Sequence, residues 1–400
     1  MKKIFIPLLI LILFLYSCGA EDADFSSVTE VSEESEVFVP YPDDLEFIEE
    51  ESFVYTPAAS EKLKAVWISQ YDITKAMCTK EGQTPVGDYA AYIDTMCKGL
   101  KNKGYNAIFV QVRPFGDSFY PSEYYPPSKY AVGAYGNSFE YDPIELLVSA
   151  AHTHGLEFHA WVNPFRLMEE KELSLIPEDS PLRQLHTWGK LSLHGGRYYL
   201  RPSDEAACAL ILNGIGEIIQ KYEVDGIHFD DYFYPTADPA FDAEDFAASG
   251  ETRLQMWRRG NVSNFVSRVY SYIKTLDADC VFGISPAGNM HYTYATCCTD
   301  IYKWCSQEGY VDYIMPQIYF GYVHSTAPFS EMVSKWSDII KTPSVKLYIG
   351  LAAYKQGEAD NNAGEGKNEW ITDKDLLSKQ AEECIERSDG YNMFSYGYIN

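Results

Sequence analysis

Short apolar runs rich in β-branched and aromatic residues recur along the chain, separated by longer stretches in which apolar residues have helical spacing. Such an alternation favours parallel strands joined by right-handed helical crossovers. Eight repeats of this unit predict an α/β fold in which the sheet closes into a (β/α)8 TIM barrel rather than staying open. The eight predicted strands are residues 64–69, 106–112, 157–163, 224–230, 280–286, 311–319, 345–351 and 391–396.

Three of the intervening stretches carry clear helix signals. Gly104 ends the first of them, as expected of a residue that can take a left-handed conformation after a helix. Asp142 and Pro143 open the second, where they suit the capping position and the first helical position. Asn400 follows the eighth predicted strand closely, so either the barrel lacks its last helix or the chain is truncated. The three stretches are residues 88–104, 141–155 and 204–223.

The N-terminal residues have a different pattern from the rest of the chain. Two lysines precede an apolar run that is short for a membrane span, which is typical of a signal peptide over residues 1–17. Cys18 follows a small residue and resembles the lipidated cysteine of bacterial lipoproteins; a plain signal peptide cleaved nearby is the alternative. Residues 18–61 are acidic and lack apolar periodicity, so we expect a disordered linker before a folded domain over residues 62–400. The sequence therefore predicts an extracytoplasmic protein held at the membrane by a lipid anchor.

The composition narrows the range of partners. The formal net charge is -26, and so acidic a chain repels nucleic acid and anionic membrane surfaces, because phosphate binding needs lysine and arginine. Aromatic residues make up 15% of the chain, including 32 tyrosines. Most of these rings will pack in the core and on the surface, but a minority in a cleft could stack on sugar rings, since tyrosine offers an apolar face and a polar edge.

The sequence gives no support for a metal or cofactor. Eight cysteines besides Cys18 have irregular spacing, and several lie in apolar runs, which predicts buried thiols rather than a disulfide framework or a metal cluster. His152 and His154 have the spacing of metal ligands but lie at the end of a predicted helix, whereas barrel metallohydrolases carry such a pair at a strand end. The absence of a phosphate-cradling GxGxxG after a strand and of GxSxG disfavours nucleotide enzymes and elbow-type serine hydrolases.

Polar and aromatic residues gather where the predicted strands end. In (β/α)8 barrels the chemistry takes place at this edge, so these side chains are expected to converge. Amide, guanidinium and carboxylate groups suit hydroxyl and acetamide recognition, and indole and phenol rings suit stacking, which together indicate a carbohydrate cleft. The predicted binding residues are Trp67, Gln111, Arg113, Asn163, Arg166, His228, Tyr232, Asn289, Gln317 and Tyr319.

Seven motifs at these strands, taken together and in order, resemble the glycosyl hydrolase-like 10 family. They are KAVWIS, FVQVRPFGDSFYPS, HAWVNPFR, VDGIHFDDYFYP, FGISPAGN, GYVDYIMPQIYF and LYIGLAAY. The resemblance extends over roughly residues 62–396. It implies a (β/α)8 barrel and glycoside hydrolysis in bacterial envelope proteins that are often lipoproteins. Among such enzymes, denuded peptidoglycan glycan strands are the substrate that the resemblance suggests.

Glycoside hydrolysis needs an acid for the leaving oxygen and a group that stabilises the oxocarbenium-like transition state. Asp230 and Asp231 end the fourth predicted strand and are the first candidates, with Asp117 as the partner carboxylate from the second strand. Asp72 and Glu123 are further candidates for that partner. Strands five to seven offer no acidic residue at their ends, so the alternative is that the 2-acetamido oxygen of the substrate acts as nucleophile.

The remaining polar candidates leave alternatives open. Arg113 and Arg166 either pair with the aspartates or bind a carboxylate of the substrate, such as the lactyl acid of muramic acid. His228 either orients Asp230 or fills the barrel. Amide side chains are expected to bind sugar hydroxyl or acetamide groups; they are Gln111, Asn163 and Gln317.

The sequence thus predicts a glycosidase of the cell envelope that acts on a polysaccharide and needs no cofactor. Two alternatives remain: a non-catalytic glycan-binding lipoprotein on a hydrolase fold, and a hydrolase of another extracellular polysaccharide. The first arises because a fold does not by itself establish an activity. The second arises because hydroxyl recognition looks alike for many glycans.

Overall fold

A computed structural model describes residues 54–57, 59 and 61–399 of the chain. The predicted signal peptide, Cys18 and most of the predicted linker lie outside the described residues. Among the helices within residues 54–57, 59 and 61–399, none combines the length and the apolar character needed to cross a membrane.

Nine strands form one sheet, in the order β12-β11-β10-β9-β5-β4-β1-β14-β13, and every neighbouring pair is parallel. β12 and β13 flank Tyr348; β12 pairs with β11, whereas β13 pairs with β14. The N–H of Gly350 also donates to the carbonyl of Pro316 at 2.9 Å, so the two ends of the sheet meet. The prediction of a TIM barrel is confirmed. The strands are β1 (Leu63–Ile68), β4 (Ala107–Arg113), β5 (Glu157–Val162), β9 (Gly226–Phe229), β10 (Val281–Ile284), β11 (Tyr313–Ile314), β12 (Lys346–Leu347), β13 (Ile349–Ala352) and β14 (Gly390–Phe394).

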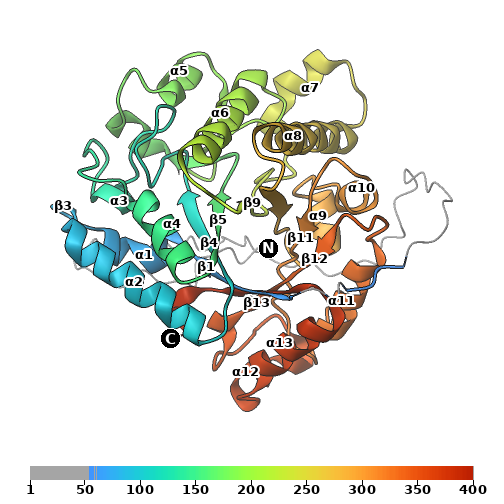
Figure 1. Cartoon of the computed structure of the whole chain (residues 1–400). Coiled ribbons are helices and arrows are strands. Elements are labelled where there is room, and N and C mark those ends of the chain that lie inside the picture. Colours follow the sequence, from blue (N-terminus) through green and yellow to red (C-terminus); the bar gives the residue numbers. More distant parts are fainter. Residues whose placement is uncertain (1–53, 58, 60, 400) are drawn as a thin grey trace, which may run out of the picture. The chain divides into compact units, whose positions relative to one another are not determined.

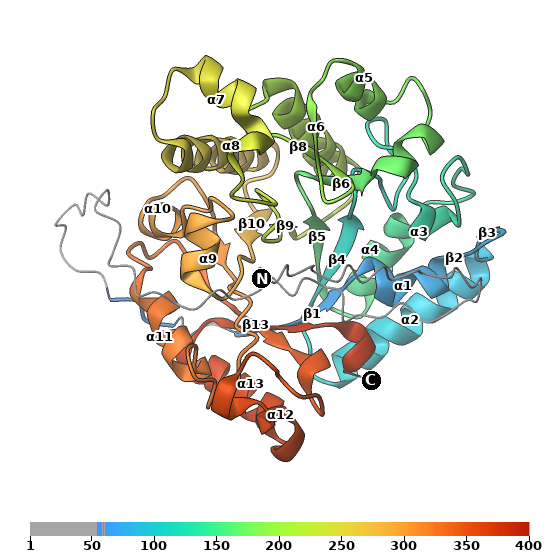
Figure 2. The same cartoon turned by 180° about the vertical axis from the view of Figure 1, so that it is seen from behind.

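Helices surround the strands (Figures 1 and 2). The predicted helix signals are confirmed: Asp142 caps α4 by accepting from the N–H groups of Ile144 and Glu145, and Gly104 follows α2 with φ of 88°. After β14, the described residues form only a 3-10 turn, Tyr396–Tyr398. The helices are α1 (Gln70–Met77), α2 (Val86–Asn102), α3 (Lys129–Val132), α4 (Pro143–Thr153), α5 (Pro181–Thr187), α6 (Glu205–Lys221), α7 (Ala243–Ser249), α8 (Leu254–Leu276), α9 (Met290–Ala295), α10 (Ile301–Ser306), α11 (Phe329–Asp338), α12 (Glu369–Thr372) and α13 (Leu376–Arg387).

Two small sheets decorate the barrel. A hairpin joins β2 (Cys78–Thr79) and β3 (Gly82–Gln83). Between β5 and α6, an insertion carries an antiparallel sheet of β6 (Arg166–Glu169), β7 (Leu191–His194) and β8 (Arg197–Leu200). Because this insertion follows the carboxyl end of β5, it adds side chains to the face of the barrel where the strands end.

One predicted strand is shorter than expected. Residues 311–319 appear as β11 with only Tyr313–Ile314, followed by an irregular stretch. Pro316 lies in that stretch, and a proline has no N–H to donate to a neighbouring strand.

Aromatic and imidazole rings close the interior of the barrel. The side chains of Phe109 and His159 stack with ring centroids 4.2 Å apart, and the ring of Tyr313 lies beside that of His228 at 6.0 Å. A Cβ added to Gly283 would come within 2.1 Å of the Tyr313 ring, so only glycine leaves room for that ring. All four ring residues are buried, which makes this layer the floor of the barrel.

The prediction of buried thiols is confirmed for the described part of the chain. All eight of its cysteines are buried and free. Burial raises the pKa of the Cys97 and Cys208 thiols to about 12, so both remain protonated and poorly reactive at neutral pH.

Candidate active site

Asp230 and Asp231 follow β9 directly at the mouth of the barrel. β9 ends at Phe229, so the alternation of a strand no longer turns the second aspartate away from the first. Asp230 is buried, with 2% of its surface exposed, whereas Asp231 is partly exposed. The charge of Arg166 acts on both carboxyl groups, which places them in one site.

A chain of amides holds Asp230 in place. The backbone N–H of Gln70 donates to Oε1 of Gln111 at 3.1 Å, and Nε2 of Gln111 donates to Oδ1 of Asn163 at 2.6 Å. Nδ2 of Asn163 in turn donates to Oδ2 of Asp230. The backbone donor fixes the orientation of the first amide, and each amide then fixes the next, so an NH2 group necessarily faces the aspartate.

Both carboxyl groups have raised pKa values. Burial raises the pKa of Asp230 to about 7, opposed by Arg166 and reinforced by the neighbouring Asp231. Burial raises the pKa of Asp231 to about 6, opposed by a backbone hydrogen bond, by Arg166 and by a hydrogen bond from Gln317. The two groups titrate as a coupled pair, so near neutral pH the pair holds about one proton. A pair with one proton and one charge can both donate a proton and stabilise a cation.

A stack of rings and guanidinium groups forms one side of the site. Cζ of Arg166 lies 4.1 Å from the ring centroid of Tyr232 and 4.8 Å from that of Phe115. Cζ of Arg197 lies 4.5 Å from the Phe115 centroid. Nε of Arg166 is buried and has no hydrogen-bond partner among the described residues. Cation–π contacts therefore hold Arg166 beside the aspartates without a carboxylate that neutralises it fully.

Rings from the last strands form the other side. Tyr319 lies near the pair, since the charges of Asp231 and Asp230 add to the burial that raises its pKa. Its ring centroid lies 6.1 Å from that of Phe394, which in turn lies 6.5 Å from that of Trp161. Gln317 is fixed by donating from Nε2 to the carbonyl of Ser285 at 2.9 Å. This side offers mostly apolar surface, as sugar stacking requires.

Four of the predicted binding residues are buried and face protein groups instead of a cleft. Gln111 and Asn163 are 1% and 0% exposed, and they belong to the amide chain described above. Arg113 is 1% exposed and donates from one NH group to the carbonyls of Asn163 and Pro164, so it holds the backbone after β5. None of these three side chains has surface for a sugar, and their prediction as direct binding residues is corrected to a supporting role.

His228 is the fourth of these residues. It is fully buried, and its Nε2 accepts from the indole N–H of Trp67 at 3.3 Å. Nδ1 then carries the proton and donates to the hydroxyl of Tyr313 at 3.0 Å. Burial and the neighbouring His159 lower the pKa of His228 well below its usual value, so the ring is neutral. Of the two alternatives for His228, its contacts support the one in which it fills the barrel.

Two of the three candidate partner carboxylates, Asp117 and Asp72, accept hydrogen bonds from protein groups. Asp117 is 0% exposed, and its oxygens accept from the N–H of Phe115 and the hydroxyl of Tyr135, both at 3.0 Å. Asp72 accepts from Ser69 at the end of β1. Glu123 is exposed, and its backbone N–H donates to another glutamate. Asp117 is therefore corrected to a residue that fixes its own loop, since no substrate can reach it.

Apart from Trp67, which is a fifth buried residue and donates to His228, the other predicted residues have more surface. Tyr232, Asn289, Gln317 and Tyr319 are partly exposed, and Asn289 also caps α9 by accepting from the N–H of Tyr292 at 2.9 Å. Trp67 is only 2% exposed. Sequence reasoning missed three residues that contribute rings or charge to the two sides: Phe115, Arg197 and Phe394. Phe115 lies within the quoted motif FVQVRPFGDSFYPS, but nothing local distinguishes these three residues, because their partners come from other strands and from the insertion.

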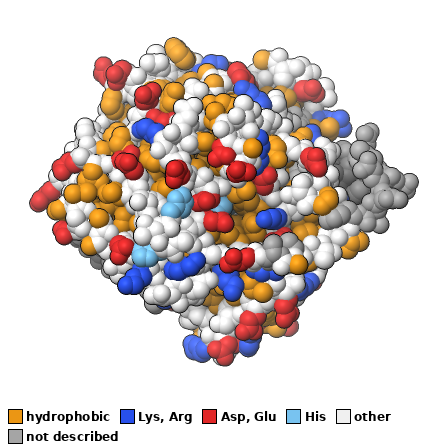
Figure 3. Space-filling model, in the orientation of Figure 1, with side chains coloured by type: hydrophobic (Ala, Val, Ile, Leu, Met, Phe, Trp, Pro, Cys, Tyr) orange, Lys and Arg blue, Asp and Glu red, His pale blue; other side chains and the backbone are white. Residues whose placement is uncertain are grey.

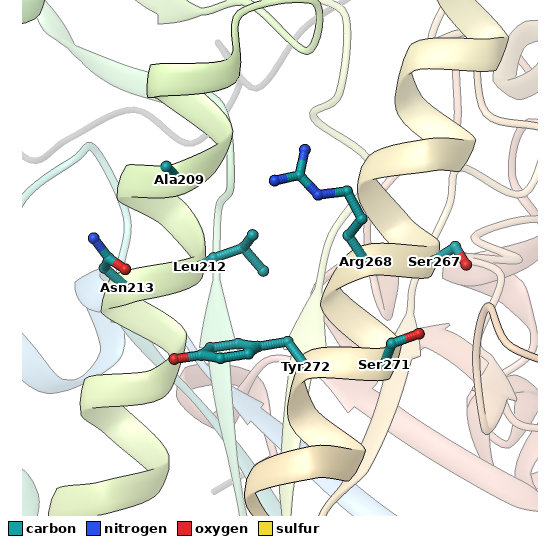
Figure 4. A pocket seen from close by; sticks show the side chains of 7 residues that line it. All are labelled: Ala209, Leu212, Asn213, Ser267, Arg268, Ser271 and Tyr272. Carbon is teal, nitrogen blue, oxygen red and sulfur yellow. The ribbon is translucent and has the colours of Figure 1, made fainter.

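Two surface hollows lie away from this site. A hollow of about 430 Å³ lies between α6 and α8 on the outside of the barrel (Figure 4). Arg268 at its edge pairs with Glu205 at 2.6 Å. A second hollow of about 760 Å³ is lined by residues at the amino ends of β5, β9 and β10, opposite the strand ends that carry the aspartates.

The charged side chains on the surface are mixed in sign. On the face in Figure 3, basic side chains are interspersed with acidic ones. His152 and His154, near the amino ends of the strands, pair with Asp225 and Asp94 at 2.9 and 2.7 Å.

The comparisons with known proteins agree with this architecture. The model of the glycosyl hydrolase-like 10 family matches residues 62–370. The chain belongs to the glycosyl hydrolase-like 10 family. Glycosyl hydrolase YngK of Bacillus subtilis is 33% identical over 330 residues, which cover 76% of this chain and 63% of YngK. Glycosyl hydrolase DigH of Escherichia coli K12 is 31% identical over 333 residues, covering 75% of this chain and 74% of DigH.

Solved structures share the barrel fold of this member of the glycosyl hydrolase-like 10 family. The glycoside hydrolase domain of PgaB (BpsB) from Bordetella bronchiseptica superposes with a TM-score of 0.55 at 10% identity, covering 85% of this chain and 95% of that domain. The catalytic domain of β-amylase from Paenibacillus polymyxa gives a TM-score of 0.50 at 12% identity, covering 86% and 94%. At such identities the likeness concerns the fold alone.

The charge of Arg166 is expected to set the pH range of any activity at this site. Activity that needs one protonated and one ionised carboxyl group decreases when the pH is lowered below about 6, because both groups are then protonated. It also decreases when the pH is raised above about 7, because both groups are then ionised. Because Arg166 lowers both pKa values, Arg166→Gln should shift the whole bell-shaped profile of kcat/KM to higher pH. Arg166→Lys keeps the charge and is the control. An unshifted profile for Arg166→Gln would show that the limbs report other groups.

Proposed function

We propose that this protein is a glycoside hydrolase of the bacterial cell envelope that cleaves denuded peptidoglycan glycan strands. The observation that carries the proposal is the adjacent pair Asp230–Asp231 at the mouth of the barrel, beside the guanidinium of Arg166, where burial raises the pKa of both carboxyl groups. Family membership supports the reaction class. The partly exposed amide of Gln317, the guanidinium of Arg166 and the aromatic side support a glycan as the ligand.

The environment of the two aspartates favours a division of roles. Asp230 is buried and accepts from Asn163 and, at 3.3 Å, from the N–H of Tyr232, which suits a fixed carboxylate that orients the substrate. Asp231 has exposed surface and can reach a glycosidic oxygen. Because the two groups share the proton and only Asp231 has exposed surface from which to pass it on, we assign proton donation to Asp231 and stabilisation of the developing positive charge to Asp230.

A substrate-assisted route follows from the position of the acids. Two adjacent residues at one strand end approach a sugar from one side, whereas a protein nucleophile must act from the other. Asp117 and Asp72, the candidates for that role, accept hydrogen bonds from protein groups. The 2-acetamido oxygen of the substrate would therefore attack the anomeric carbon while Asp231 protonates the departing oxygen. Water then opens the cyclic intermediate and returns a proton to Asp231, with retention of configuration.

We further propose that the protein is exported and anchored at the membrane. The lysines and apolar run of residues 1–17, with Cys18 after them, support export and a lipid anchor at the membrane. Attachment through a lipid would keep the barrel close to the envelope polymer.

The test is digestion of peptide-free peptidoglycan strands followed by mass spectrometry. The expected products are new saccharides whose reducing ends show which bond breaks. Strands from which the N-acetyl groups have been removed should resist, because they lack the internal nucleophile. Equal cleavage of both would reject the substrate-assisted route. Binding without any cleavage would favour a non-catalytic glycan-binding protein. Cleavage of a different polysaccharide would show that the substrate is not peptidoglycan.

A further inference from the structure

A series of tyrosine rings leads from the aspartate pair toward solvent. The ring centroid of Tyr319 lies 5.9 Å from that of Tyr354, which lies 6.2 Å from that of Tyr398. Phe394 lies 6.1 Å from both Tyr319 and Tyr354 and joins them to the mouth of the barrel. Tyr398, at the outer end, is 45% exposed, so its ring is accessible to a ligand. The three residues Tyr319, Tyr354 and Tyr398 are called the tyrosine series below.

The outer end of the series is fixed by hydrogen bonds. Oδ1 of Asp72 accepts from the hydroxyl of Ser395 at 3.0 Å and from the N–H of Gly397 at 2.9 Å. Oδ2 of Asp72 accepts from the N–H and hydroxyl of Ser69 at 2.8 and 2.7 Å. Asp72 thus fastens the turn that carries Tyr398 to the end of β1, beside which β14 runs (Figure 2). A ring fixed in this way loses little conformational entropy when a ligand binds.

The charges around the series indicate the ligand. Burial raises the pKa of Tyr354, and the charges of Asp360 and Tyr398 add to the effect. The charge of Asp72 likewise acts on Tyr398. The carboxylate of Asp360 pairs with Lys355 at 2.7 Å, and that of Asp72 accepts hydrogen bonds from Ser395 and Gly397, so both charges are already satisfied by protein groups. An uncharged pyranose ring suits the site, because its C–H face can stack on a phenol while its hydroxyl groups bond to the ring oxygens.

We propose that the tyrosine series forms consecutive subsites for the same glycan chain that is cut at Asp230–Asp231, with an uncharged sugar residue stacked on the outermost ring, Tyr398. This inference rests on the proposed function, and continuity of the rings with the aspartate pair supports it. The enzyme would then prefer strands long enough to reach from the aspartates to Tyr398. N-acetylglucosamine, the uncharged sugar of a denuded strand, would occupy the outermost position, and the acid-bearing sugar would lie elsewhere.

The test compares strands of increasing length with the full chain and its variants. Tyr398→Ala is expected to lower kcat/KM on long strands roughly 3- to 10-fold, mainly through KM, as for the loss of one aromatic contact. The loss should shrink as the strand shortens and no longer reaches the outer ring. Tyr398→Phe keeps the ring and should restore most of the efficiency. Trp188→Ala is the control, since Trp188 is 62% exposed on the insertion and outside the series.

Each outcome separates the inference from the proposed function. A wild-type enzyme that cleaves long strands while Tyr398→Ala cleaves them equally well overturns the tyrosine series but leaves the glycosidase intact. A loss that is the same at every length also overturns it, because it would reflect a general disturbance of the fold. If the wild-type protein cleaves nothing, the proposed function fails, and the subsites are then tested by measuring the binding of long strands. Weaker binding by Tyr398→Ala than by Trp188→Ala supports the subsites, and equal binding overturns them.

Discussion

Asp231→Asn is expected to lower kcat on peptide-free glycan strands roughly 10²- to 10⁴-fold, the usual contribution of a positioned general acid. The amide has nearly the same shape as the carboxyl group but has no proton to transfer to the glycosidic oxygen. An aryl 2-acetamido glycoside with a good leaving group needs little protonation. Asp231→Asn should therefore lose much less activity on that substrate than on the natural strands.

Asp230→Asn provides the comparison that distinguishes the two roles. Its loss should persist with the activated substrate, because the developing positive charge remains unstabilised whatever the leaving group. Asp279→Asn, an exposed aspartate before β10, should behave as wild type. If the activated substrate rescued Asp230→Asn and not Asp231→Asn, the assignment of the proton donor would be reversed.

Asp242→Asn is expected to lower the free energy of unfolding by about 3–5 kcal/mol, because it leaves a buried guanidinium without its counter-charge. Arg258 and Asp242 have fully buried side chains and approach to 2.5 Å. Arg258 also donates to the carbonyls of Thr236 and Asp238, at 3.3 and 2.8 Å. The pair thus anchors the segment between β9 and α8 that begins with Asp230 and Asp231.

Denaturant unfolding measures this effect, and the chain contains a matched control. Arg268 and Glu205 form a comparable pair at 2.6 Å, but Glu205 has 76% of its side chain exposed. Glu205→Gln should therefore cost less than about 1 kcal/mol. Similar losses for Asp242→Asn and Glu205→Gln would mean that the buried pair does not hold the segment together.

The barrel could be predicted because the sequence features that specify its strands and helices are local. Each strand and helix has its own periodicity and its own caps, as at Asp142 and Gly104, and the number of repeats determines closure. Even β11 departs from its prediction for a local reason, the proline that follows it. The adjacent aspartates were also accessible to prediction, because they come straight after a buried strand.

The site was harder to predict because burial at a strand end depends on distant partners. Gln111 looks like a sugar-binding amide until its partner, the backbone N–H of Gln70, is known, and that residue belongs to another repeat. Asp117 faces its own loop for a similar reason, since Tyr135 covers it. A sequence shows that a polar side chain follows a strand, but not whether another segment already occupies its hydrogen-bonding groups.

The ring layer beneath the aspartates limits how protons can move. Phe109, His159, His228 and Tyr313 are all buried, and His228 is neutral and bonded at both nitrogens. A neutral ring with both nitrogens occupied is a poor proton carrier, so His228 does not connect the pair to the layer beneath it. We expect protons to enter and leave through the mouth, which a bound glycan covers. The water that completes hydrolysis would then also reprotonate the pair, so each catalytic cycle restores its own acid before the product departs.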